Sequence, residues 1–177
     1  WKALEARGRA VWGEAWWARW ADDVAAYGGR VDQGRGDGLR ARVGAPVAHE
    51  DDPERAVRAG LRMHATLAQS MSRSTPDGGL DIRMRVGINT GEVLVGAVAG
   101  TEYTAMGDVV NTAPRLHEAA PPGRILGGQS TYALAPQAIR FEPARQLETT
   151  GRETSIAPWL AAAPQAPPGR TQRRAGA

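Results

Sequence analysis

The 177-residue chain contains no cysteine, a single lysine and a single phenylalanine. The absence of cysteine excludes a disulfide framework, so nothing in the sequence requires an oxidising compartment. Long apolar runs are also absent: the longest, around Val93 to Ala99, is far shorter than the ~20 residues that a membrane-spanning helix needs. We therefore expect a cytoplasmic location and no membrane span.

The sequence starts at Trp1, without a methionine or a signal-peptide pattern. We therefore expect an N-terminally truncated fragment. Its length suits one domain with a tail, since a domain of ~150 residues buries roughly two-thirds of the surface of its unfolded chain. We predict a domain over residues 1–157 and a disordered Ala/Pro/Arg-rich linker or tail over residues 158–177.

Positive charge comes almost entirely from arginine, and a formal net charge of +3 accompanies a sequence pI near 9.9. Such a pI is typical of proteins that bind nucleic acids. The arginines are scattered, however, and no recognition-helix or RNP-like pattern accompanies them. We therefore predict no specific nucleic-acid partner.

The N-terminal segment has the composition of a helix. Residues 4–26 are rich in Ala, Arg and Glu, and the glycines of Tyr27-Gly28-Gly29 suit a left-handed C-terminal cap. Within this helix, Trp12, Trp16 and Trp20 recur every four residues and form one stripe. The stripe suits burial against a sheet or a partner subunit, or contact with a membrane surface.

The rest of the chain mixes short strands with helices. We predict strands over residues 30–32, 39–43, 124–126 and 139–142, a hairpin over 82–96 with Asn89-Thr90-Gly91 at its tip, and helices over 52–71, 108–120 and 130–134. The lack of strict alternation favours an α+β fold over a doubly wound sheet. His64 lies on the apolar side of its helix, where a lone histidine is more often a core residue than a ligand.

Two short segments carry chemistry. Asn111 and Arg115, four residues apart on a predicted helix, project from one helical face. An amide beside a guanidinium suits holding a ribose and neutralising charge on a phosphate during transfer, and the alternative interpretation is a solvated polar face. The second segment, Gly36-Asp37-Gly38, is a hairpin turn when taken by itself.

Four sequence blocks occur in the order found in one family. They are Gly36-Asp37, the segment from Val43 through His49 to Ala56, Arg85-Val-Gly-Ile-Asn-Thr-Gly-Glu92 and Gly107-Asp-Val-Val-Asn-Thr-Ala-Pro-Arg115. Over residues 23–157 the chain resembles class III adenylyl/guanylyl cyclase catalytic domains of bacteria, especially actinobacteria. The resemblance implies an α+β, ferredoxin-like nucleotidyl cyclase fold with a mixed or antiparallel sheet, packed helices and its first strand missing.

The resemblance also implies a reaction. In this family the ribose 3′-hydroxyl of ATP attacks the α-phosphate, giving cyclic AMP and pyrophosphate with two Mg²⁺ or Mn²⁺ ions per site. Asp37 matches a metal-binding aspartate, and Asn111 and Arg115 match the catalytic pair. Gln33 and Thr104 match the substrate-binding residues that select the base. Neither the Glu nor the Cys of guanylyl cyclases stands at those two positions, so ATP is the expected substrate.

Partners and an alternative follow from the same resemblance. Family members are homodimers with shared active sites, in which one chain supplies the metal aspartates and the other supplies the Asn, the Arg and the base-selecting residues. The second metal aspartate would precede Trp1, and a C-terminal ATPase or helical-repeat region is an expected neighbour. Pro114 is expected to kink the helix just before Arg115. The alternative function is a non-catalytic cyclase-homology module that dimerises or senses nucleotide.

Overall fold

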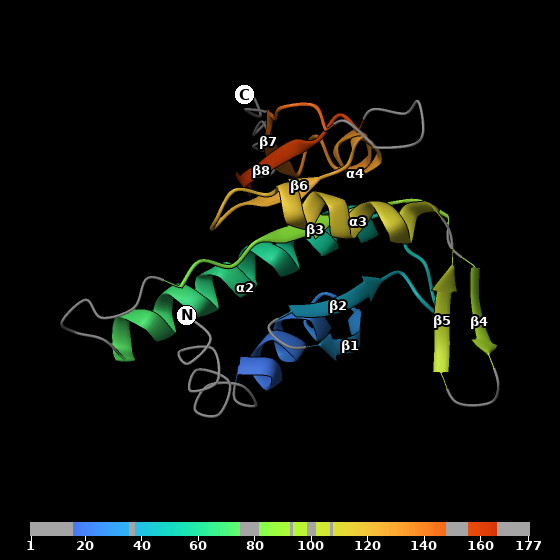
Figure 1. Ribbon diagram of the computed structural model, residues 1–177, viewed down its shortest axis with the longest axis horizontal. Helices are drawn as coiled ribbons and strands as arrows, with labels where there is room; N and C mark the ends of the chain where they lie inside the picture. The colour runs from blue at the N-terminus through green and yellow to red at the C-terminus, as the bar shows by residue number, and fades with distance from the viewer. Residues whose placement is uncertain are drawn as a thin grey trace, which may run out of the picture.

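The computed structural model describes residues 16–35, 38–74, 82–92, 94–98, 102–106, 108–147 and 156–165. Only the backbone is described for residues 33–35, 73–74, 94–98, 102–106 and 108. Residues 16–25 are helical. The chain then runs through β1 (Gly29–Arg35), β2 (Gly38–Val43), α2 (Asp52–Ser74), β3 (Val86–Ile88), β4 (Leu94–Val98), β5 (Glu102–Met106), α3 (Asp108–Ala119), β6 (Ile125–Gly127), α4 (Gln129–Leu134), β7 (Ile139–Pro143) and β8 (Trp159–Pro164) (Figure 1).

A mixed four-stranded sheet has the strand order β3-β6-β8-β7. Strands β3 and β6 are parallel, whereas β8 is antiparallel to both β6 and β7. The antiparallel pairs β1-β2 and β4-β5 form separate two-stranded sheets. Figure 1 shows β4 and β5 standing apart from the four-stranded sheet. The α+β class and the mixed sheet agree with the prediction.

The four-stranded sheet buries apolar side chains on both faces, because successive residues of a strand point to opposite sides. On β6, Ile125 packs on the α2 side and Leu126 on the α3 side, and both are buried. The α2-side core consists of Val57, Ile125, Ala135, Ile139 and Ala161. The α3-side core consists of Leu116, Ala120 and Leu126. Helices α2 and α3 therefore cover opposite faces of the same sheet.

The predicted hairpin over residues 82–96 is wrong. Its first strand, β3, pairs in parallel with β6, and its second, β4, pairs with β5. The residues expected at the hairpin tip instead contact helices, since the Asn89 amide reaches α3 and the Thr90 hydroxyl lies 2.9 Å from that of Thr131 in α4. The physical reason is that these polar groups find partners in α3 and α4, so the chain leaves one sheet for another.

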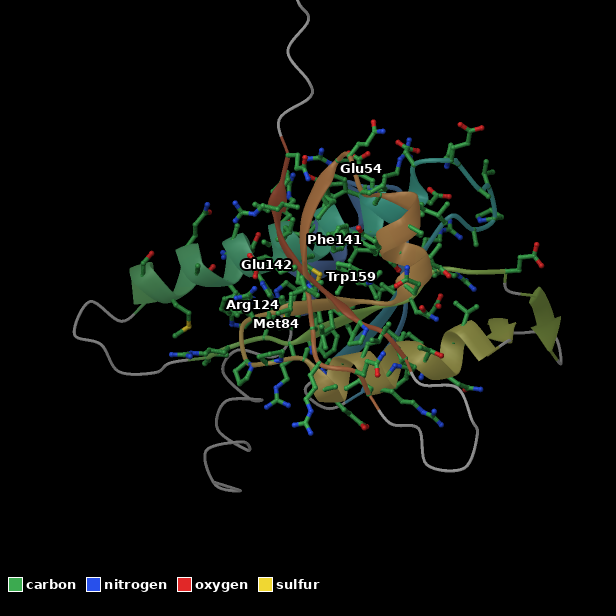
Figure 2. The ribbon with its side chains drawn as sticks, turned by 90° about the horizontal axis from the view of Figure 1, so that it is seen from above. Glu54, Met84, Arg124, Phe141, Glu142 and Trp159 are labelled. Atoms are coloured by element: carbon green, nitrogen blue, oxygen red, sulfur yellow. The ribbon has the colours of Figure 1, made fainter. Side chains whose placement is uncertain are left out.

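The predicted disordered tail over 158–177 is wrong for residues 158–165, and residues 166–177 lie outside the described part of the chain. Strand β8 is an inner strand, paired with β6 on one side and β7 on the other. Its Trp159 stacks on Tyr132 at a ring-centroid distance of 3.7 Å and donates from Nε1 to Gln129. Figure 2 labels Trp159 on this strand. Alanine and proline have low strand propensity, so composition concealed a strand that tertiary packing determines.

Most other predicted elements are confirmed, with shifts of a few residues. Gly28 takes a positive φ of 76° where the first helix ends, as its capping role requires. Trp16 is buried and its ring lies 5.8 Å from that of Trp20, whereas Trp12 lies outside the described residues. Among the described helices, none combines the length and apolar character needed to cross a membrane.

Candidate functional site

Helix α3 presents the predicted catalytic pair to solvent. Asn111 and Arg115 are both exposed, and their spacing of four residues places them on one helical face. Leu116, the next residue, is fully buried in the core against the sheet. Helix α3 is therefore amphipathic, with its buried side fixed and its polar pair free to meet a ligand or a partner surface.

Gly87 in the middle of β3 lets α3 approach the strand at backbone distance. A Cβ atom added there would collide with the Ala113 carbonyl oxygen and the His117 amide, and would lie 2.8 Å from the His117 Cα. Both neighbours are helix backbone, so they cannot rotate away as a flexible side chain can. Only glycine fits this position, and the contact sets how close α3 lies to the sheet.

The loop after β3 supports the beginning of α3. Asn89 Nδ2 donates to the Val109 carbonyl oxygen at 3.2 Å. A Cβ at Gly91 would lie 2.5 Å from Val109 Cγ2, so this glycine also admits the first turn of the helix. Sequence reasoning missed this support because it placed residues 89–91 at a hairpin tip.

Pro114 lies inside α3, two turns from its start, and the helix continues through it from Asp108 to Ala119. Proline has no N–H, so the Val110 carbonyl lacks the partner that residue 114 would ordinarily supply. This missing hydrogen bond lies between the turn that carries Asn111 and the turn that carries Arg115. The conformation of α3 therefore depends more than that of an uninterrupted helix on contacts with neighbouring strands and loops.

The two predicted base-selecting residues lie on different strands. Thr104 belongs to β5, which contacts α3, and Gln33 belongs to β1; neither side chain is among those described. Gln33 follows a register shift in which Asp32 is the extra residue of β1. Asp32 forms a 3.0 Å ion pair with Arg42 of β2, which accounts for a charged residue in that strand.

Asp37 lies outside the described residues, between the paired ends Arg35 and Gly38 of β1 and β2. Within the ranges that are described, no cluster of three or more His, Cys, Asp or Glu side chains could hold a metal ion. The structure thus brings Asn111 and Arg115 together on one face of α3, and β5, the strand of Thr104, leads into the start of the same helix.

Comparisons with known proteins match most of the chain. The family model described as "Adenylate and Guanylate cyclase catalytic domain" matches residues 33–162. Adenylate cyclase 1 of Rhizobium meliloti (strain 1021) is 34% identical over 138 residues, which is 75% of this chain and 21% of that protein. The chain thus spans about a fifth of the length of this relative.

Solved structures agree in fold. The crystal structure of the guanylyl cyclase Cya2 has a TM-score of 0.77 and 30% identity, covering 86% of this chain and 79% of that one. The adenylyl cyclase CyaB from P. aeruginosa has a TM-score of 0.77 and 25% identity, covering 88% of this chain and 82% of that one. The chain therefore belongs to the adenylate and guanylate cyclase family, as a class III nucleotidyl cyclase catalytic domain.

Proposed function

We propose that this domain is an adenylyl cyclase, which converts ATP to 3′,5′-cyclic AMP and pyrophosphate. The observation that carries the proposal is the exposed Asn111–Arg115 pair on one face of α3, a helix whose other face is fixed to the sheet through Leu116. The similarity to adenylate cyclase 1 supports ATP as the substrate. The similarity to the guanylyl cyclase Cya2 makes GTP the competing substrate.

Asn111 and Arg115 have different roles in this proposal. Negative charge develops on the phosphate oxygens as the ribose 3′-oxygen attacks the α-phosphorus and pyrophosphate leaves. The planar guanidinium of Arg115 neutralises that charge through hydrogen bonds that strengthen in the transition state. The amide of Asn111, one helical turn away, holds the ribose so that the 3′-oxygen is in line for attack.

Base selection falls to Thr104 and Gln33. A threonine hydroxyl and a glutamine amide can each donate or accept, so together they can match the amino group and ring nitrogen of adenine. Gln33 stands where adenylyl cyclases of this family usually have lysine. We therefore expect ATP to be preferred over GTP by a smaller margin than in a lysine-containing relative.

The family implies divalent metal ions, and we assign one to Asp37. Asp37 matches a metal-binding aspartate of the family, and the other carboxylate of the same hairpin, Asp32, forms a 3.0 Å ion pair with Arg42. A carboxylate is the kind of ligand that Mg²⁺ and Mn²⁺ prefer. When bound, such ions polarise the phosphate and favour ionisation of the attacking hydroxyl.

We further propose that the domain acts as a homodimer, with Asp37 of one chain completing the site formed by Asn111 and Arg115 of the other. The test measures cyclic AMP and cyclic GMP production by the full-length protein with ATP or GTP and Mn²⁺ or Mg²⁺. Arg115→Ala is expected to lower product formation by roughly 10²- to 10³-fold. Arg58→Ala, which removes an arginine from α2, is the matched control and should retain the rate.

Mixing two inactive variants tests the shared site. Asp37→Ala and Arg115→Ala chains co-refolded or co-expressed in equal amounts should recover about a quarter of the wild-type activity, because half of the dimers are mixed and each mixed dimer has one intact site. Activity that survives Arg115→Ala would refute the catalytic assignment. If both variants are inactive and mixing them restores no activity, the shared site is refuted, whereas the catalytic role of Arg115 is not.

Pro114 favours one other function, a non-catalytic module that senses nucleotide, because it removes a hydrogen bond from the helix that carries the proposed catalytic pair. The same assay, combined with calorimetric titration of ATP, separates the two. Binding of ATP with no cyclic product under any metal condition would establish the sensing function in place of catalysis.

A further inference from the structure

Strand β3 has two unlike faces. Val86 and Ile88 of β3 pack on the α2-side core, whereas Gly87 and the two residues that flank the strand, Arg85 and Asn89, contact α3. This alternation follows from the period of two along an extended chain. The α3-facing set contributes no aliphatic side chain, so it contacts the helix through hydrogen bonds and backbone approach.

The three residues contact α3 at three positions along the helix axis. Arg85 Nη1 donates to the Glu118 carbonyl oxygen at 3.2 Å, near the end of the helix. Gly87 lies under its middle, and Asn89 Nδ2 donates to the Val109 carbonyl oxygen at 3.2 Å in the first turn. The Arg85 side chain is exposed, whereas Asn89 is half-buried, so the hydrogen bond of Asn89 is the less accessible to competing water.

The Asn89 side chain is also wedged in place. A Cβ at Gly128, just before α4, would collide with Asn89 Oδ1, so the amide fills the space that this glycine leaves. The opposite end of the amide faces the Val109 carbonyl, an acceptor that requires the NH₂ group. The amide is therefore held on both sides, and it links the start of α3 to the start of α4.

We propose that Asn89 is a positioning residue for the Asn111–Arg115 pair. Val109 precedes Asn111 by two residues, so a hydrogen bond to its carbonyl fixes the height and rotation of the turn that carries Asn111. Pro114 deprives that turn of one hydrogen bond to the turn that carries Arg115. The first half of the helix therefore relies on the hydrogen bond of Asn89 and on the close packing at Gly91, while Leu116 and Gly87 hold the second half. The catalytic consequence rests on the proposed function.

Three variants of the full-length protein separate hydrogen bonding from packing. Asn89→Asp keeps the shape but places an acceptor against the Val109 carbonyl, and Asn89→Ala removes both shape and donor. Thr90→Val is the control, because it removes a 2.9 Å hydroxyl contact from the same loop but toward Thr131 of α4. The first readout is amide hydrogen exchange along α3, which requires no catalysis. The second is the separate change in kcat and KM.

Asn89→Asp and Asn89→Ala are each expected to accelerate exchange in the first turns of α3 by about 10-fold, with α2 unchanged. Both should lower kcat by about 10- to 100-fold, with KM changed less than about 3-fold, because misplacement affects the transition state more than binding. In Asn89→Asp, the ratio of kcat to that of the wild type should rise as the pH is lowered, since the protonated acid can donate to Val109. Asn89→Ala should show no such rise.

Exchange in α3 that is unchanged in both Asn89 variants, or equally faster in Thr90→Val, would overturn the positioning role. Faster exchange in α3 with an unchanged kcat would overturn its catalytic consequence. A wild-type protein that forms no cyclic nucleotide would refute the proposed function, whereas the exchange comparison would still decide whether Asn89 holds α3.

Discussion

The two helices that cover β3 are held in different ways. Helix α2 packs on Val86 and Ile88 through aliphatic side chains, and a Cβ added at its Gly60 would meet only side-chain atoms, the nearest being Ile125 Cδ1 at 3.1 Å. Helix α3 lies on the opposite face, where Gly87 admits its backbone and Asn89 binds its first turn. One strand therefore supports a side-chain interface on one face and a backbone interface on the other.

The two interfaces contribute differently: the α2 side mainly stabilises the fold, whereas the α3 side mainly fixes the position of a helix. Aliphatic packing is non-directional and contributes in proportion to buried area, so the α2 interface contributes mainly to stability. Backbone contact and hydrogen bonds fix position, so α3 cannot shift without breaking them. The helix with the exacting support is also the one that carries Asn111 and Arg115, as a site that needs accurate placement requires.

Alanine substitution of the two glycines tests this contrast and should produce the largest difference. Gly87→Ala introduces a Cβ that collides with backbone of α3, so we expect a loss of about 3 kcal/mol in the free energy of unfolding, at the upper end of overpacking costs. Gly60→Ala should change that free energy by less than about 1 kcal/mol, because the gain in helix propensity offsets a mild side-chain contact. Denaturant unfolding measures both.

The rate of cyclic nucleotide formation completes the glycine comparison. Under conditions where both variants are folded, Gly87→Ala should lose activity by at least about 10-fold, because α3 is displaced from the strand. Gly60→Ala should keep the wild-type rate. Equal losses of activity in the two variants would mean that both faces of β3 position the site and do not differ in this role.

Pro114→Ala gives a smaller effect of opposite sign. It restores an N–H that can donate to the Val110 carbonyl, and it removes a residue unfavourable in a helix interior, while the unfolded chain gains entropy. We expect a net stabilisation of about 1–2 kcal/mol, measured as a rise in the denaturation midpoint. If β3 sets the orientation of α3, kcat should change less than about 3-fold. A larger change would show that the proline itself aims Arg115.

Much of this organisation could be predicted from the sequence, where local signals were strong. Gly28 marked the end of the first helix, and the spacing of Asn111 and Arg115 indicated a shared face, which α3 shows. The ordered blocks indicated a nucleotidyl cyclase domain, and the family comparison confirms it. Each of these features can be recognised within short stretches of sequence, which is why pattern alone was sufficient.

The pairing of strands that lie far apart in the chain could not be predicted from local sequence patterns. The glycines and turn residues around Asn89 are typical of a hairpin. Strand β3 instead pairs with β6, and the register that joins Val86 to Ile125 and Ile88 to Gly127 places each partner 39 residues further along the chain. Strand β8 was missed because alanine has a low strand propensity. This segment is a strand because it pairs with β6 on one side and β7 on the other. The role of Asn89 depends on where α3 docks, so no local signal could have identified it.

The α2 side of the sheet contains a partly buried histidine, His64, that makes stability depend on pH, and this gives the smallest predicted effect. Burial lowers the pKa of His64 below its ordinary value of 6.5, and a hydrogen bond with the Met84 backbone opposes the shift only in part. His64 borders a hollow that Arg124 and Glu142 also line, and Figure 2 shows these two residues near Met84. The Nε2 atom of His64 is buried, with no hydrogen-bond partner among the described residues.

Because the folded state holds His64 neutral while the unfolded chain binds a proton near pH 6.5, the free energy of unfolding should fall as the pH drops below 6.5 and level off below the folded-state pKa. Glutamine does not titrate, so in the His64→Gln variant the free energy of unfolding should depend less on pH below 6.5. Denaturant unfolding at several pH values measures this dependence. Amide exchange at mildly acidic pH should then increase around α2 before α3. Earlier opening of α3 would show that protonation of His64 is not what loosens the fold at mildly acidic pH.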